Sequence, residues 1–180
     1  MIGEDGTFMR HFGEGELENP KSLAIDASSG KVYVTDYDSH RICVFSQEGA
    51  LIKMFGAKGS NSGEFHFPLD LSISVNSHLY VTDTQNHRIQ VFTLQGDFVR
   101  EFSTGQQSNP FGVLVLADST VLAFVHEKQM SAFNEKGEAI HTFGQRGKGE
   151  GCFKDARVFV VDDNGDLLIS EWKNKRVQIF

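Results

Sequence analysis

Hydrophobic and polar residues alternate along short stretches of this chain, and turn-type residues separate the stretches. The first four are LAID (23–26), KVYVTD (31–36), RICVFS (41–46) and ALIKMFG (50–56). The next four repeat the order, with LSISV (71–75), HLYVTD (78–83), RIQVFT (88–93) and DFVREFS (97–103). Short runs rich in valine, isoleucine and phenylalanine, with turns about every 8 to 12 residues, are typical of β-strands. The pattern therefore predicts an all-β protein.

The order of strands recurs with a period of about 45 residues, which is the signature of a repeat architecture. It divides the chain into four units, approximately 12–56, 57–103, 104–144 and 145–180. The third unit continues with GVLVLA, VLAFVH, MSAFN and AIHTFG, and the fourth with VFVVD, DLLISE and RVQIF. Four-stranded units at a fixed period are typical of β-propeller blades, whose faces are buried against neighbouring blades. We expect one propeller domain over residues 1–180.

Three copies of one motif resemble the repeats of a known family. YDSHRICVF (37–45), TQNHRIQVF (84–92) and WKNKRVQIF (172–180) each follow an acidic residue. Together with the Phe-Gly turns, the glycine-rich loops and the proline that leads three of the first strands, they resemble NHL repeats over essentially the whole chain. The third unit departs furthest, because Val125 and Met130 replace the acid and the arginine. The resemblance implies a propeller of four-stranded NHL blades, most often six, as in tripartite-motif (TRIM-NHL) ubiquitin ligases, some secreted lyases and bacterial sensor proteins.

The last unit contains three predicted strands, so its fourth strand has to come from elsewhere. GTFMRHFG at 6–13 shares its glycine, its spacing and its closing Phe-Gly with GALIKMFG at 49–56. This N-terminal strand can complete the fourth blade and close a ring of four, which removes two exposed sheet edges. The alternative is an arc of a larger propeller. We favour the arc, because four repeats are fewer than the resemblance implies.

An acidic residue precedes an arginine by five positions in three of the four units. The pairs are Asp36 with Arg41, Asp83 with Arg88, and Glu171 with Arg176. Each pair brackets the four-residue turn between the second and third strands, where the carboxylate can accept from turn amides or pair with the guanidinium. A threefold copy argues against a unique catalytic group. We therefore expect structural turn pairs.

In a propeller, the turns between second and third strands lie on one side, which we call the loop face. It comprises residues 37–40, 84–87, 126–129 and 172–175. Loops on a rigid scaffold commonly carry binding function. Its candidate binding residues are Tyr37, His40, Asn86, His87, Lys128, Trp172, Lys173 and Lys175. We expect its histidines to be exposed, and Tyr37 and Trp172, which occupy equivalent positions, to be free to meet a partner.

Composition narrows the choice of partners. The formal net charge is −7, from 24 acidic and 17 basic side chains, which disfavours attraction of the whole surface to nucleic acid. The basic loop from Lys173 to Arg176 keeps RNA as an alternative. Cys43 and Cys152 fit neither a disulfide framework nor a Cys-x-x-Cys clamp, so no disulfide-linked partner is expected.

The apolar stretches of the chain bear on its cellular location and on contact with a membrane. The chain has none that approaches the ~20 residues of a membrane helix. Its start lacks the apolar segment of a secretory signal. We therefore expect a cytoplasmic protein without a membrane partner.

The expected function is recognition of a protein partner, without catalytic residues, cofactor or metal site. The seven histidines form no convincing zinc set. The resemblance implies substrate recognition in a ubiquitin ligase context, with the RING domain outside these residues. Two alternatives remain: RNA binding by the loop face, and a metal-assisted lyase that uses His40, His87 and His126.

Overall fold

The computed structural model describes residues 8–125 and 129–180, and within them it forms four antiparallel sheets. The first contains β1 (Pro20–Ile25), β2 (Val32–Asp36), β3 (Arg41–Phe45) and β4 (Leu51–Phe55). The second contains β5 (Pro68–Ile73), β6 (His78–Asp83), β7 (Arg88–Thr93) and β8 (Phe98–Ser103). The third contains β9 (Pro110–Val115), β10 (Val121–Val125), β11 (Met130–Phe133) and β12 (Ala139–Phe143). The fourth contains β15 (Ala156–Val161), β16 (Leu167–Glu171) and β17 (Arg176–Ile179).

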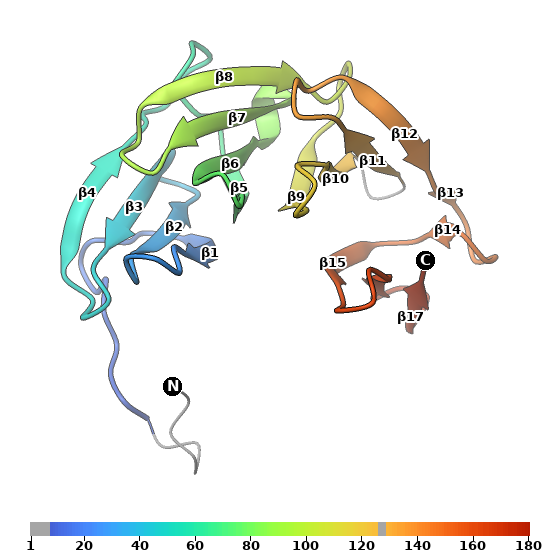
Figure 1. The fold of residues 1–180 in the computed structure, drawn as a ribbon, viewed down its shortest axis with the longest axis horizontal. Helices are drawn as coiled ribbons and strands as arrows, with labels where there is room; N and C mark the ends of the chain where they lie inside the picture. Colours follow the sequence, from blue (N-terminus) through green and yellow to red (C-terminus); the bar gives the residue numbers. More distant parts are fainter. Residues whose placement is uncertain (1–7, 126–128) are drawn as a thin grey trace.

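The sheets are arranged as propeller blades. Within each sheet, strands that follow one another in the sequence are hydrogen-bonded neighbours. The first strands, β1, β5, β9 and β15, gather toward the centre of the arc, and β4, β8 and β12 lie on its outer rim (Figure 1). The predicted all-β propeller of four-stranded blades is therefore confirmed, although the fourth sheet has three strands within the described residues.

The hydrophobic pattern located the strands closely, and the main difference lies at the first strand of each blade. β1 and β5 begin at Pro20 and Pro68, three residues before the apolar alternation from which they were predicted. Their ladders are irregular between Pro20 and Leu23 and between Pro68 and Leu71. A proline at the first position of a strand does not remove a ladder hydrogen bond. The irregular start therefore extends these strands beyond the alternating pattern.

The remaining elements are short. β13 (Gln145–Arg146) and β14 (Cys152–Phe153) pair in parallel within the loop that leads to the fourth sheet. A 3₁₀ turn, η1 (Thr84–Asn86), follows β6. Within the described residues, no helix is long and apolar enough to cross a membrane.

The core consists of four clusters. Three are each shared by two consecutive blades, and the fourth, of Val34, Cys43 and Phe45, lies in the first blade. The first includes Tyr33, Ile42, Leu79 and Phe92; the second Tyr80, Ile89, Val113 and Phe133; the third Leu122, Phe124, Phe153 and Ile169. Each blade thus contacts chiefly its neighbours, as in other repeat proteins.

One phenylalanine contact recurs at every blade boundary. A phenylalanine at the end of the outer strand packs on the phenylalanine near the end of the next blade's third strand. The ring centroids are 5.3 Å apart in Phe55–Phe92, 5.2 Å in Phe102–Phe133 and 5.4 Å in Phe143–Phe180. A Cβ at Gly96 would lie 2.8 Å from the Phe55 ring, so the turn after the third strand requires glycine there.

Phe12 takes the same position against the first blade. Its ring lies 5.1 Å from that of Phe45, and Arg10 Nη2 donates to the Gln47 carbonyl at 2.5 Å. Residues 8–13 nevertheless form no strand, and β17 pairs only with β16 among the described residues. The expectation that residues 6–13 complete the fourth blade is therefore wrong for the described part, residues 8–13, because the fourth blade stands at the other end of the arc (Figure 1).

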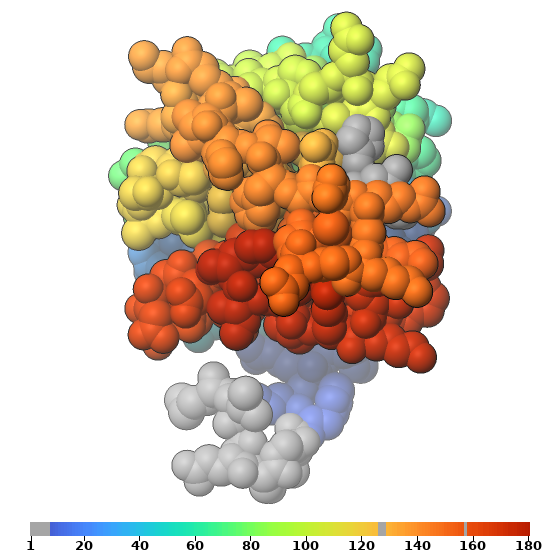
Figure 2. Space-filling model, turned by 90° about the vertical axis from the view of Figure 1, so that its right-hand side faces the viewer, coloured from blue at the N-terminus to red at the C-terminus, as the bar shows by residue number. Residues whose placement is uncertain are grey.

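Of the two alternatives, the structure has the open arc. The first and fourth blades stand at its two ends (Figure 1), and within the described residues no strand of one pairs with a strand of the other. In Figure 2, the red atoms of the fourth blade form the lower part of the surface that faces the viewer, and yellow to orange atoms of the third blade lie above them.

Candidate functional site

The acid and arginine of the second blade hold the loop that leads into that blade. Arg88 Nε donates to Asp83 Oδ2 at 2.7 Å. The other guanidinium nitrogens donate to the carbonyls of Ser60, Asn61 and Glu64 at 2.9 to 3.0 Å. The His66 amide donates to Asp83 Oδ1 at 2.7 Å. The pair thus joins the hairpin between β6 and β7 to the incoming loop, residues 56–67.

The fourth blade repeats this arrangement. Arg176 Nε donates to Glu171 Oε2 at 2.5 Å, and Arg176 also donates to the carbonyls of Lys148, Gly149 and Cys152. In the first blade, Arg41 Nη2 lies 3.1 Å from Asp36 Oδ2 and reaches one loop carbonyl, that of Glu16. The carboxylates of Asp36 and Glu171 accept from main-chain amides of the incoming loops. The sequence had suggested the amides of the turn as donors.

Burial and hydrogen bonding act in opposite directions on Asp36. Burial raises the pKa of its carboxyl, and donors from Asn19, Ser39, Glu18 and Arg41 lower it. The donors together outweigh burial, so the pKa is below its usual value. The ionised carboxylate is therefore part of the folded first blade.

Two glutamines add hydrogen bonds to the acid–arginine pairs of the second and fourth blades. This role was not predicted from the sequence. Gln90 Nε2 donates to Asp83 Oδ2 and to the Glu64 carbonyl, and its Oε1 accepts from the Gly63 amide. Gln178 makes the equivalent contacts to Glu171, Cys152 and Gly151. The signal was present, because glutamine stands two residues after the arginine in TQNHRIQVF and in WKNKRVQIF.

Three candidate binding residues of the loop face make hydrogen bonds within the propeller. His40 is buried, and its Nδ1 accepts from the Phe67 amide at 3.0 Å. His87 Nδ1 lies 3.2 Å from the Ser108 carbonyl, and Asn86 Nδ2 donates to Gly59 and Asp83. The expectation that the loop histidines are exposed is wrong for His40, because its ring joins two blades.

Tyr37 and Trp172 occupy equivalent positions but differ in surroundings. Tyr37 stacks on Phe67 of the next blade with a centroid distance of 4.7 Å, and Lys21 Nζ lies 5.6 Å from the Tyr37 ring. Trp172 stands on the last blade and is 66% exposed. Its indole is therefore the large aromatic surface on this part of the loop face.

The basic candidates are placed around Trp172. Lys173 Nζ lies 3.4 Å from Asp155 Oδ2, and Lys175 is exposed in the left-handed conformation with φ of 53°. Lys128 and His126 lie outside the described residues. Lys173 is thus partly neutralised by a carboxylate of its own blade.

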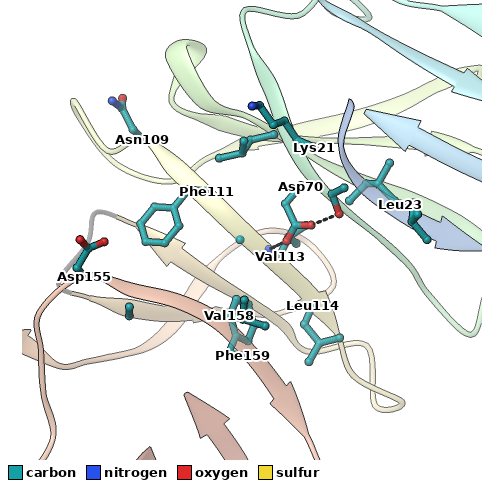
Figure 3. Close-up of a pocket in the computed structure, with 15 residues that line it drawn as sticks. Lys21, Leu23, Asp70, Asn109, Phe111, Val113, Leu114, Asp155, Val158 and Phe159 are labelled. Carbon is teal, nitrogen blue, oxygen red and sulfur yellow. Dashed lines mark hydrogen bonds between the residues drawn. The ribbon is translucent and has the colours of Figure 1, made fainter. Parts of the chain in front are cut away.

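A cavity of about 760 Å³ lies between the first strands of the four blades. Its polar lining residues are Lys21, Ser22, Asp70, Asn109 and Asp155, and its apolar lining includes Leu23, Phe111, Val158 and Phe159 (Figure 3). Asp155 belongs both to this lining and to the pair with Lys173. Asp155 therefore connects the cavity lining to Lys173 of the loop face.

Asp70 joins three blades at the wall of this cavity. Its carboxylate accepts from Ser22 Oγ in the first blade and from the Val113 amide in the third. Burial raises the pKa of Asp70 above its ordinary value, against the effect of those donors. With both oxygens engaged, Asp70 positions the inner strands. The described residues contain no group of three or more His, Cys, Asp or Glu side chains that could hold a metal.

Part of the chain is similar to an E3 ubiquitin-protein ligase and to a RING finger protein. Human E3 ubiquitin-protein ligase NHLRC1 is 34% identical over 67 residues, which are 37% of this chain and 17% of that protein. RING finger protein nhl-1 of Caenorhabditis elegans is 33% identical over 61 residues, covering 34% of this chain and 6% of that protein. The matched part thus spans less than a fifth of these relatives.

Solved structures share the architecture at low identity. Catalytically inactive virginiamycin B lyase from Staphylococcus aureus with quinupristin gives a TM-score of 0.68 at 18% identity, over 89% of this chain and 55% of that one. A chain of the nidogen/laminin complex gives 0.64 at 19% identity, over 78% of this chain and 52% of that one. These likenesses show the fold alone.

A family model described as a 6-bladed beta-propeller matches residues 17–131, which is more than half of the chain. This match agrees with the blade order and with the NHL-type similarity to the ligases. The chain therefore belongs to the 6-bladed beta-propeller family and carries repeats of the NHL type.

Proposed function

We propose that this chain is a non-enzymatic recognition module that holds a protein partner on the loop face, beside the mouth of the central cavity. The observation that carries the proposal is Trp172. Its ring is 66% exposed, and it stands on a turn that the Glu171–Arg176 pair fixes to the incoming loop. Exposed tryptophans on rigid supports are frequent anchors of protein interfaces.

The context that we propose is recruitment of a substrate for ubiquitin transfer. The support is the similarity to the NHL region of a ligase whose name states that activity. The chain would then choose the protein, and the catalytic RING domain would lie elsewhere. Lys175 beside Trp172 supplies an exposed charge for orientation of the partner.

The test combines capture with transfer. The chain and its Trp172→Ala variant are fused to an active RING domain, and the proteins that become ubiquitinated in cells are quantified by mass spectrometry. A set that depends on Trp172 supports the proposal. Ile140→Ala is the matched control, because Ile140 is an exposed apolar residue on the outer strand β12. Identical sets from wild type and Trp172→Ala would refute the role of this face.

RNA binding remains the alternative function, and Lys173 and Lys175 are its basis. The pairing of Lys173 with Asp155 reduces the free positive charge there. Binding through phosphate contacts weakens steeply with salt. A filter-binding titration of a single-stranded RNA that shows such a slope, lost in Lys175→Ala, would favour RNA over protein.

A further inference from the structure

The fourth blade exposes an apolar face that the inner blades bury. Val177 and Ile179 of β17 are 59% and 66% exposed. The residues at the same two ladder positions in the first and second blades are at most 4% exposed: Ile42, Val44, Ile89 and Val91. Each of these four packs in a core cluster that its blade shares with the next blade. The fourth blade therefore presents the kind of face that a following blade covers.

The first blade has the complementary face. At its end of the arc (Figure 1), Leu23 and Ile25 of β1 are 60% and 57% exposed. Their equivalents in the second blade, Leu71 and Ile73, pack in the cluster shared with the first blade. The first blade thus exposes the face with which a blade receives the one before it.

Residues 8–13 stand where the outer strand of a preceding blade would stand. Phe12 packs on the phenylalanine ring that ends β3, and Arg10 donates to a carbonyl of the turn after β3. The outer strand β4 makes the same two contacts with the second blade, through Phe55 and Lys53. The segment is therefore seated as an outer strand, although it belongs to no ladder among the described residues.

β17 has an edge that matches this segment. Among the described residues β17 pairs with β16 alone, whereas β3, β7 and β11 each pair on both sides. An unpaired strand edge is a template for an added strand. In the register of β3 with β4, Ile42 stands opposite Phe55. The same register places Val177 opposite Phe12, so apolar residues meet across the added pair.

The two ends also carry opposite charges. Lys175 occupies the position of His87 in its turn and shares its left-handed conformation, with φ of 53° against 58°. His87 contacts Ser108, which stands two residues before the first strand of the next blade. Two residues before β1 stands Glu18, which is exposed and accepts from Ser39 Oγ at 2.9 Å. A following first blade would therefore bring a carboxylate to Lys175.

We propose that copies of this chain join head to tail, with the fourth blade of one copy against the first blade of another. Residues 8–13 of the second copy add to β17 as its outer strand. Val177 and Ile179 are then covered by the second copy, and Lys175 pairs with its Glu18. In the free chain, Lys175 orients the partner protein as proposed above. The joint is heterologous, so the copies form a ring if the rotation between them closes and an open chain if it does not.

The test is analytical ultracentrifugation of the full chain from about 1 to 200 µM, where weak association becomes visible as a rising mass. Phe12→Asp alters the first-blade side of the joint, and Ile179→Asp alters the fourth-blade side. Each places a carboxylate in the apolar joint, so each weakens association at least about tenfold. Ile140→Asp, at a 57% exposed residue of the outer strand β12, is the matched control and leaves association unchanged. Circular dichroism shows that each variant is folded.

Mixing the two variants separates a head-to-tail joint from a symmetric one. Phe12→Asp retains an intact β17, and Ile179→Asp retains an intact N-terminal segment. A mixture of the two therefore regains one complete joint and forms a 1:1 dimer, although each variant alone stays monomeric. A symmetric interface uses the same surface on both copies and is not restored by mixing.

Hydrogen exchange tests the added strand itself. The amides of residues 8–13 exchange rapidly in the dilute chain and are protected at high concentration, because the joint supplies their main-chain partners. A chain that stays monomeric over the whole concentration range would overturn the inference, as would a mixture of variants that forms no dimer. Association without protection of residues 8–13 would show that the copies meet through another surface.

Discussion

The second and third blades share one strand plan but hold their incoming loops in different ways. In the second blade, a buried acid, an arginine and a glutamine bind the long loop 56–67 through its main chain. In the third blade, Val125 and Met130 are buried at the positions of acid and arginine. Its shorter incoming loop, 104–109, is held by hydroxyls, as Ser108 Oγ donates to the Thr104 carbonyl at 2.8 Å.

This difference between the two blades indicates the structural role of the acid–arginine pair. A long loop between blades carries many main-chain carbonyls that need donors. Arg88 and Arg176 each donate to three carbonyls in the two loops that precede their blades, Arg41 donates to one in the segment before β1, and the third blade has no arginine. The acid fixes the guanidinium, and the guanidinium fixes the loop. Replacing the acid and the arginine of the second blade tests this difference between the two blades.

The largest effect is expected for Arg88→Ala. The variant leaves Asp83 buried without its cation and removes three carbonyl contacts and the pair with Glu101, so the free energy of unfolding falls by about 3 to 5 kcal/mol. Urea denaturation monitored by circular dichroism measures it. Arg146→Ala, at an exposed arginine, serves as the control and changes stability by about 0.5 kcal/mol or less. If Arg88→Ala lowers the free energy of unfolding no more than Arg146→Ala does, the pair does not stabilise the incoming loop.

An intermediate effect is expected when the second blade receives the residues of the third. Arg88→Met alone leaves the buried Asp83 carboxylate without its cation, although His66, Asn86 and Gln90 still donate to it. Asp83→Val with Arg88→Met removes both charges. The double variant should be about 1 to 2 kcal/mol more stable than Arg88→Met alone, because no buried charge remains. The same denaturation assay on the four proteins of the cycle gives the coupling. Additive losses would show that the two residues act separately.

The smallest effect concerns pH and the first blade. The pKa of Asp36 is lowered on folding, so its contribution is complete above the usual value of 3.8 and disappears as pH falls through the lower folded value. Wild type should therefore lose more stability than Asp36→Asn when the pH falls from 5 to 3. Thermal unfolding at each pH records the difference. Parallel curves for the two proteins would contradict the assignment.

Most of the fold could be predicted from the sequence, because blade strands are defined by local alternation. KVYVTD and RIQVFT became β2 and β7 within one residue of their predicted bounds. The position of residues 8–13 was not predictable in the same way. GTFMRHFG has the pattern of an outer strand, and Phe12 does occupy the place of one, but a pattern does not state which sheet will pair with it.

The candidate site was less accessible to sequence reasoning. His40 and His87 look alike in the motif, and both adopt positive φ, yet their partners come from the following blade. The cavity depends on side chains from four blades that are far apart in the sequence. Asp155 and Asn109 lie just before their first strands and outside the copied motif. Repetition therefore identifies the scaffold, and the binding surface that we propose lies where the repeats differ.

Phe12 has a consequence for how the chain is protected from exchange and cleavage. Its ring is held against Phe45, while residues 8–13 belong to no hydrogen-bonded ladder. Amide hydrogen exchange reports main-chain hydrogen bonds, and side-chain packing alone does not slow it to the same degree. The segment should thus exchange rapidly although its aromatic side chain is fixed. Side-chain order and main-chain protection are separate properties here, and a protease would find a segment that is anchored yet open to attack.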